Sequence, residues 1–372
     1  RWLKAIRHFI ALPDRYQYNL ADSIFATATG HPTMKAIVFD QSLPISQPNA
    51  LFETQVPTPT ASGRDLLVKI SAIGVNPIDS KVRLRALPEK AEKGAEKILG
   101  FDAVGTVEAI GSDVSLFNVG DVVFYAGDVG RQGSNAEYQL VDERIVGFAP
   151  KNIDHAHAAA LPLTAITAYE MLFDRLMIDA QNKYSSAKPV ILITGAAGGV
   201  GSIMIQLAKA LCPQATVIAT ASREASQAWC KKMGADHVVN HHNGIQTALE
   251  KLGIKEVSHI ASLTHTSQHF DDYIELIKPQ GKICLIDDPA TPLNIQALKM
   301  KSVSLHWELM FTRARFETDD MIKQHHILNE VSQLLDDGKI QSTLTENFGQ
   351  MNAENLIKAH AKMERADMIG KL

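Results

Sequence analysis

Residues 190–201 read VILITGAAGGVG, and this stretch decides the fold of the chain. Its first four residues form a short unbroken apolar run, which is typical of a strand covered on both faces in a parallel sheet. Three glycines, Gly195, Gly198 and Gly201, follow the run, and from Ile203 apolar residues return with helical spacing. The sequence therefore predicts a strand, a glycine turn and a helix in direct succession.

A glycine turn between a strand and a helix predicts a dinucleotide site. Glycines let the backbone turn tightly and approach a pyrophosphate, and the N–H groups at the helix start face the phosphates. The residues expected to form this site are Gly195, Ala197, Gly198, Gly199, Val200 and Gly201. The alternative is an ordinary strand–helix turn that holds no ligand.

The end of the next strand indicates which nucleotide binds. An NAD site has an acidic residue there, about 20 residues beyond the glycine turn, which bonds the ribose 2′-hydroxyl. In this chain the strand expected at 217–221 ends in Ser222 and Arg223, and Glu224 follows. A hydroxyl and a guanidinium suit a 2′-phosphate. We therefore expect NADPH in preference to NADH, although Glu224 weakens the argument.

Composition excludes several classes of partner. The 372 residues suggest about two domains, and 37 basic against 41 acidic residues leave a net charge of −4. No charge excess favours nucleic acid or a membrane surface, and no apolar run approaches the roughly 18 residues of a membrane span. The three cysteines are far apart and form no CxxC pair. This pattern predicts a protein of the reducing cytoplasm without disulfides.

The chain divides into parts with different expected secondary structure. Residues 1–33 precede the first methionine, Met34, and are expected to be an extension outside the fold. From Met34 to about Leu161, short strands bounded by glycine predict a barrel or sandwich. From there strands and helices alternate, which predicts a parallel sheet built from βαβ units. Residues 319–335 are expected to be helical again.

In their order, five motifs resemble the medium-chain dehydrogenase/reductase superfamily, and within it the quinone-oxidoreductase branch with the zinc-type alcohol dehydrogenase-like proteins. They are GVNPID at 74–79, LGFDAVG at 99–105, GDV at 120–122, LPLTA at 161–165 and the glycine turn.

The resemblance implies an α/β plus β fold. A chaperonin-10-like barrel catalytic domain would comprise 34–158 and 318–372. A Rossmann domain with a doubly wound parallel sheet, residues 159–317, would be inserted into it. The active site would lie between the two domains of each subunit of a homodimer. The implied activity is NADPH-dependent reduction of a quinone or an α,β-unsaturated carbonyl compound.

Zinc-dependent members of this superfamily use metal ligands that are missing here. Asn76 stands where they place a first cysteine, and Phe101 precedes Asp102 where they place histidine before an acidic residue. The histidine pairs 241–242 and 325–326 are expected on the surface, because adjacent side chains on regular structure point different ways. We expect no bound metal.

Without a metal, the protein must orient the hydride donor and offer hydrogen-bond donors to the carbonyl oxygen. Asn76 is the first candidate, and the alternative is that its side chain only caps the turn before Pro77. Lys81 stands where some relatives carry tyrosine. It could stabilise an enolate or donate a proton, or be an ordinary exposed lysine. Asp79 is expected to hold Lys81 or Arg83 in place.

Further residues complete the expected site. The expected cofactor-binding residues are those of the glycine turn together with Ser222, Arg223, Asn76, Thr164, Leu263 and Ile286. A substrate wall, or else core or subunit-interface packing, is expected from Trp307, Met310, Phe311 and Arg313. Two other functions remain open, a non-catalytic NADPH-binding redox sensor and a zinc-dependent alcohol dehydrogenase. The physiological substrate and the proton donor do not follow from the sequence.

Overall fold

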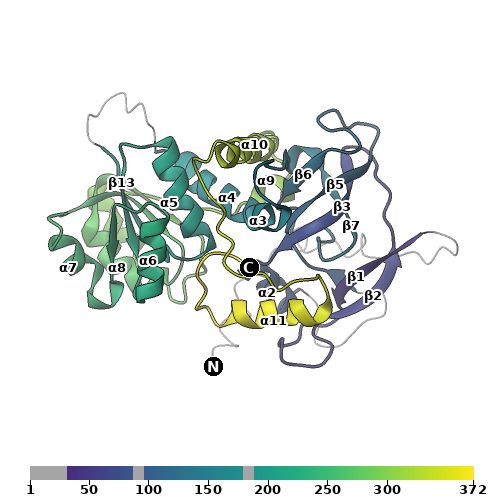
Figure 1. The fold of residues 1–372 in the computed structure, drawn as a ribbon. Helices are drawn as coiled ribbons and strands as arrows, with labels where there is room; N and C mark the ends of the chain where they lie inside the picture. Colours follow the sequence, from purple (N-terminus) through teal and green to yellow (C-terminus); the bar gives the residue numbers. More distant parts are fainter. Residues whose placement is uncertain (1–31, 87–95, 179–187) are drawn as a thin grey trace.

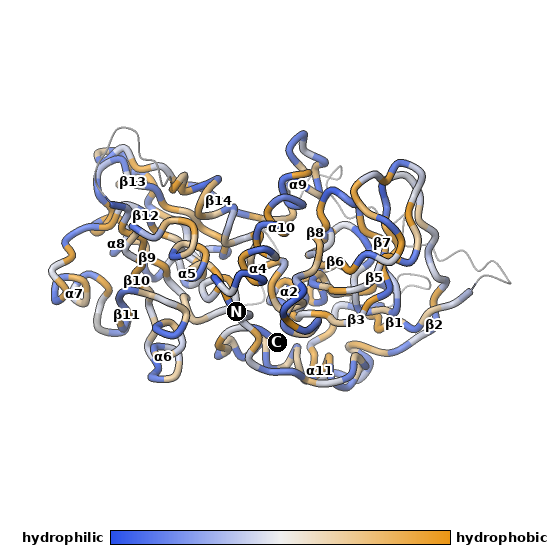
Figure 2. Tube along the Cα trace, turned by 45° about the horizontal axis from the view of Figure 1, so that its top comes forward, coloured by the Kyte–Doolittle hydropathy of each residue, from blue (hydrophilic) through white to orange (hydrophobic). Residues whose placement is uncertain are grey.

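The computed structural model describes residues 32–86, 96–178 and 188–372, which form two lobes (Figure 1). Residues 1–31 of the expected N-terminal extension lie outside the described residues, and the first strand begins at Thr33. Apolar residues run along the strands of both lobes (Figure 2). In the described part of the chain, no helix has the length and apolar character needed to cross a membrane.

The first lobe is built from short antiparallel strands, as the glycine-bounded strand pattern predicted. Its three-stranded sheet has the order β2-β1-β4, and its five-stranded sheet has the order β7-β3-β5-β6-β8. The strands are β1 (Thr33–Phe39), β2 (Phe52–Pro57), β3 (Asp65–Gly74), β4 (Lys97–Ile98), β5 (Asp102–Ile110), β6 (Val122–Tyr125), β7 (Tyr138–Asp142) and β8 (Val146–Phe148).

The second lobe holds a six-stranded parallel sheet of order β11-β10-β9-β12-β13-β14. Its strands are β9 (Val190–Thr194), β10 (Thr216–Thr220), β11 (His237–Val239), β12 (Val257–Ser262), β13 (Ile277–Leu285) and β14 (Ser304–Trp307). Its helices are α5 (Gly199–Leu211), α6 (Glu224–Lys232), α7 (Ile245–Glu250) and α8 (Thr266–Leu276). The chain leaves β9 toward β10 on one side and later returns to β12 on the other. Ligands of open α/β sheets bind at such a reversal, outside the carboxyl ends of the strands.

The remaining helices include several that pack on strands of the β-rich lobe. They are α2 (Pro77–Arg83), α3 (His155–Ala159), α4 (Pro162–Tyr169) with a π-helical turn (Glu170–Arg175), α9 (Thr312–Arg315), α10 (Lys323–Asp336) and α11 (Ala353–Glu364). Short 3₁₀ turns occur at Glu143–Ile145, His241–Asn243 and Ile295–Lys301. Helix α4 packs on α5, α10 on β8, and α11 on α2. The chain thus returns from the parallel sheet to the β-rich lobe.

The C-terminus lies between the two lobes (Figure 1). Gly370 N donates to Ala197 O in the glycine turn at 2.8 Å, while Val75 N in the β-rich lobe donates to Leu372 O at 3.1 Å. Gly370 has φ 64°, and a Cβ there would lie 2.5 Å from Thr343 O, so the tail needs glycine at this point. The last residues therefore join both lobes.

Candidate functional site

The glycine turn has the backbone geometry of a phosphate cradle. Gly195 has φ 69°, and a Cβ there would lie 2.7 Å from Thr264 Cγ2; at Gly201 a Cβ would lie 2.4 Å from Ala196 O. These two glycines are required by the turn itself. Helix α5 has Gly198 as its N-cap, and no side chain caps it. A Cβ at Gly198 would meet only one carbonyl oxygen, at 3.5 Å. The helix N-terminus is thus available to an anion, and the residues fit a dinucleotide.

Arg223 lies where the sequence placed it, just after β10 at the N-cap of α6. Its side chain is exposed, and Nη2 donates to Asp367 O at 2.8 Å. Ser222 is half-buried beside it, and Glu224 is exposed at the start of α6. A guanidinium with free N–H groups at the carboxyl end of β10 suits a 2′-phosphate.

Of the other expected cofactor residues, two lie next to the glycine turn and one lies farther along the sheet. Thr164 in α4 and Leu263 after β12 flank it, because Thr164 Cγ2 would lie 3.0 Å from a Cβ at Gly199, and Leu263 N donates to Thr194 O at 3.4 Å. Ile286 follows β13, one strand farther along the sheet. Apart from Asn76 and Thr164, the expected cofactor residues thus lie at the carboxyl ends of β9, β10, β12 and β13.

The Asn76 side chain is fully buried in a polar network. Its Nδ2 donates to Asp102 Oδ2 at 2.8 Å, and its Oδ1 accepts from Lys371 Nζ at 2.6 Å. Asn76 is the N-cap of α2, in a capping box with Asp79, and its amide also faces these distant partners, so it does more than cap the turn before Pro77. The Asp79 carboxylate accepts from Asn76 N at 2.7 Å.

Asp102 and Lys371 form a buried ion pair of 2.8 Å, with exposed fractions of 0% and 1%. Asp102 Oδ1 also accepts from Leu163 N at 2.7 Å, and Lys371 Nζ also donates to Val75 O at 3.1 Å. The sequence pattern did not indicate Lys371 as a site residue, since a lysine at the end of a chain is ordinarily solvated. The only sequence signal for Lys371 is that its two neighbours, Gly370 and Leu372, are not polar.

Comparison with known proteins agrees with this arrangement. The family model "Alcohol dehydrogenase GroES-like domain" matches residues 62–151, and "Zinc-binding dehydrogenase" matches 199–324. The zinc-type alcohol dehydrogenase-like protein SAS2087 of Staphylococcus aureus is 44% identical over 339 residues, or 91% of this chain and 99% of that protein. The chain belongs to the medium-chain dehydrogenase/reductase superfamily, among its zinc-type alcohol dehydrogenase-like proteins.

Solved structures of this superfamily confirm the fold. A putative zinc-dependent alcohol dehydrogenase from Rhizobium etli has a TM-score of 0.86 at 47% identity, covering 92% of this chain and 97% of its own. The quinone oxidoreductase of Coxiella burnetii has a TM-score of 0.70 at 27% identity, covering 92% and 98%. The GroES-like domain and the Rossmann sheet expected from the resemblance are confirmed. The protein is an oxidoreductase of this superfamily.

Asp79 has a different role in this dehydrogenase/reductase from the one expected. It is buried, and its second oxygen accepts from Gly100 N at 3.0 Å. Burial raises the pKa of its carboxyl to about 7, although the bonds from Asn76 N and Gly100 N and the charge of Lys371 act to lower it. It holds neither Lys81 nor Arg83; it is turned inward, where it fixes backbone.

Those two cations pair elsewhere. Lys81 Nζ lies 3.2 Å from Asp288 Oδ2, and both side chains are substantially exposed. The pair joins α2 to the segment after β13, and thus one lobe to the other. Arg83 is buried and pairs with Glu364 at the end of α11.

The expected substrate wall divides into buried and exposed members. Phe311 is buried, and its ring centroid lies 5.1 Å from that of Phe101. Met310 is also buried, whereas Trp307 is 55% exposed. Arg313 is buried and forms ion pairs with Glu170, Asp174 and Asp320. Arg313 therefore connects the π-helical turn to the segment before α10.

Among the described residues, no group of three or more histidine, cysteine or acidic side chains could hold a metal ion. The expectation that both histidine pairs lie on the surface is wrong for His325. Helix α10 turns this residue inward against β8, where its Nδ1 lies 2.6 Å from Val146 O, while His326 is exposed. The three cysteines are buried, and none of them forms a disulfide.

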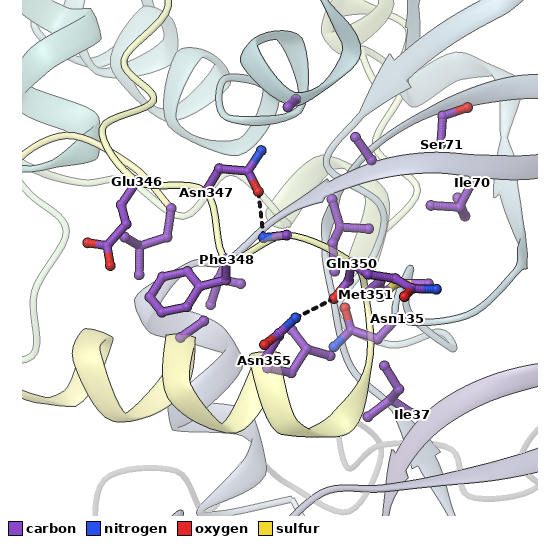
Figure 3. A pocket seen from close by; sticks show the side chains of 18 of the residues that line it. Ile37, Ile70, Ser71, Asn135, Glu346, Asn347, Phe348, Gln350, Met351 and Asn355 are labelled. Atoms are coloured by element: carbon purple, nitrogen blue, oxygen red, sulfur yellow. Dashed lines mark hydrogen bonds between the residues drawn. The ribbon is translucent and has the colours of Figure 1, made fainter.

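A separate cavity of about 460 Å³ lies in the β-rich lobe (Figure 3). It is bounded by β1, β3 and residues 344–359, and its wall includes Ile37, Ile70 and Phe348. None of the expected catalytic or cofactor residues lines it. It meets the network above only through Val75 and Leu372, so it is separate from the expected dinucleotide site.

Proposed function

We propose that the protein is an NADPH-dependent oxidoreductase that reduces quinones or α,β-unsaturated carbonyl compounds by hydride transfer, without zinc. The observation that carries the proposal is the pairing of an uncapped α5 N-terminus with an exposed Arg223 at the end of the next strand. The similarity to the quinone oxidoreductase of Coxiella burnetii supports the acceptor class.

Each part of the site has a task in this proposal. Bound NADPH would supply the hydride. The α5 N–H groups hold the pyrophosphate and Arg223 takes the 2′-phosphate, while Thr164, Leu263 and Ile286 line the rest of the cofactor.

Two polar residues would serve the acceptor. Asn76 Nδ2 carries a second N–H besides the one bonded to Asp102, and this donor would face the carbonyl oxygen. Because Asn76 is fully buried, a substrate oxygen reaches it only after neighbouring side chains shift. Lys81, which is part-exposed, would stabilise an enolate or donate the proton.

The decisive experiment follows the loss of NADPH absorbance with a panel of quinones and enones, with NADH in parallel and after dialysis against a chelator. We expect acceptor-dependent oxidation that is faster with NADPH and insensitive to the chelator. NADPH binding without turnover of any acceptor would favour the redox-sensor alternative. Alcohol oxidation that the chelator abolishes would favour the zinc-dependent dehydrogenase.

The setting of this activity is also proposed. The lack of disulfides among the three cysteines supports a reducing cytoplasm, and the net charge of −4 supports small-molecule substrates without a nucleic-acid or membrane partner. A homodimer is supported by the exposed Trp307 and Leu309 at the free edge of the parallel sheet.

A further inference from the structure

Lys371 reaches from the glycine turn to the Asn76 amide. Its backbone follows Gly370, which bonds to Ala197 in the turn. Its stem lies against the start of α5, since a Cβ at Gly199 would lie 2.8 Å from Lys371 Cδ. Its ammonium ends at Asn76 in the other lobe. One side chain therefore contacts both halves of the proposed site.

The ammonium has all its donors occupied. Its three N–H groups match three acceptors: Val75 O at 3.1 Å, Asn76 Oδ1 at 2.6 Å and Asp102 Oδ2 at 2.8 Å. With Lys371 only 1% exposed, no water competes for these bonds. The ammonium is thus held in one geometry.

This arrangement fixes which way the Asn76 amide points. Its oxygen faces the cation, and its NH₂ group faces the Asp102 carboxylate. A flipped amide would place NH₂ against the ammonium and oxygen against the carboxylate, which is repulsive at both ends. The direction of the second N–H of Asn76 is therefore also set by Lys371 and Asp102.

We propose that Lys371 is a positioning residue, whose ammonium orients the Asn76 amide while its stem holds the glycine turn against it. The inference rests on the proposed reductase function. It assigns to Lys371 a part in turnover through Asn76 and no contact with the substrate.

The competing explanation is that Lys371 only neutralises Asp102. Lys371→Met alone does not separate the two, because it leaves the buried Asp102 carboxylate without a cationic partner and destabilises the fold. The informative variant is K371M/D102N, which removes both charges and keeps the stem against Gly199. K209M/D236N removes a half-exposed Lys–Asp pair of the Rossmann lobe and is the matched control.

We expect K371M/D102N to melt close to the parent and to bind NADPH with a parent-like Kd by fluorescence titration. Its kcat should fall about 10- to 100-fold with little change in the KM for the acceptor, because a lost oxyanion donor costs about 10²–10³ in kcat and a misaimed one a part of that. The control should match the parent in all four measurements. Parent-like kcat in K371M/D102N overturns the proposal.

If K371M/D102N does not fold, Lys371→Arg tests the proposal instead. It keeps the charge beside Asp102, but a planar guanidinium cannot reproduce the three-way geometry of the ammonium. We expect a folded protein with the same loss of kcat, and an Arg variant as active as the parent overturns the proposal. If none of the acceptors in the panel is reduced by the parent protein, the proposed function fails instead. The two failures are therefore distinct.

Discussion

The Asp79 carboxyl is held where its negative charge is costly. It is buried beside Asp102, and its two oxygens accept only backbone N–H groups. Burial raises its pKa from 3.8 to about 7, so the folded protein keeps a proton that the unfolded chain loses. The stability that comes from this proton is full below about pH 4 and is lost as the pH rises to about 7.

This linkage predicts a pH-dependent difference between the parent and Asp79→Asn. Between about pH 5 and pH 7 the unfolding free energy of the parent should fall by roughly 1.4 kcal/mol per pH unit relative to the variant, which cannot titrate at this position. The variant also loses one backbone bond, which lowers its stability equally at every pH. Urea unfolding across this range measures the difference, with Asp271→Asn as the exposed control. Parallel curves for parent and Asp79→Asn would contradict the assignment.

Arg223 carries the choice of cofactor. If its guanidinium binds the 2′-phosphate, Arg223→Ala removes a contact worth roughly 1.5–3 kcal/mol, and NADPH affinity falls about 10- to 150-fold. NADH affinity should hardly change, because NADH has no 2′-phosphate. Titration of both cofactors measures the ratio, and Lys231→Ala on the same helix controls for loss of a nearby charge. Equal losses for both cofactors would assign Arg223 to the fold or the adenine.

At the scale of the element, the N-terminus of α5 shows which glycines serve the turn and which serve a ligand. Gly195 and Gly201 exclude any side chain, and Gly199 is covered by Lys371 and Thr164. Gly198 differs, since its φ of −74° suits any residue and the space beside it is open. Its lack of a side chain therefore has no steric cause within the described chain, and the pyrophosphate of the proposed cofactor would supply one.

This difference predicts the outcome of Gly198→Asp. The fold should be kept, because aspartate is a favourable N-cap, and the melting temperature should equal or exceed that of the parent. NADPH binding should be lost, since the carboxylate would face the pyrophosphate. Gly198→Asn has the same shape without the charge and should keep more affinity. NADPH titration and thermal melting test both variants, and unchanged affinity in Gly198→Asp would remove the cofactor from this turn.

At the scale of the whole molecule, one edge of the parallel sheet carries large, exposed apolar side chains. Strand β14 is the last in the order, and Trp307 at its end and Leu309 just beyond are 55% and 56% exposed. An edge strand with large apolar side chains is a surface for pairing with another chain. Pairing of two copies there would give the expected homodimer.

The dimer should dissociate when this edge is made polar. We expect the parent to sediment as a dimer and Trp307→Lys/Leu309→Lys as a monomer, because charges at the contact would be buried without partners. Leu252→Lys changes an exposed leucine just after α7, which packs on β11 at the opposite edge, and should remain dimeric. A monomeric parent would refute the expected assembly.

The sequence by itself determined the features that neighbouring residues encode. Strand β9, the glycine turn and α5 occur where the apolar run and glycine spacing predicted them, because backbone sterics and periodicity act within a few residues. The division into a β-rich and a parallel-sheet lobe followed from the same local patterns. The position of Arg223 at the end of β10 followed from its count along the chain.

Only the tertiary structure decided the partners of the buried polar groups. Lys371 meets Asn76 and Asp102 across 295 and 269 residues of sequence, and His325 is buried against Val146 across 179. A lysine or histidine is buried only where distant residues supply acceptors, and a single-chain pattern does not record them. The same reason accounts for Asp79, whose partners are backbone groups that only the fold brings to its carboxylate.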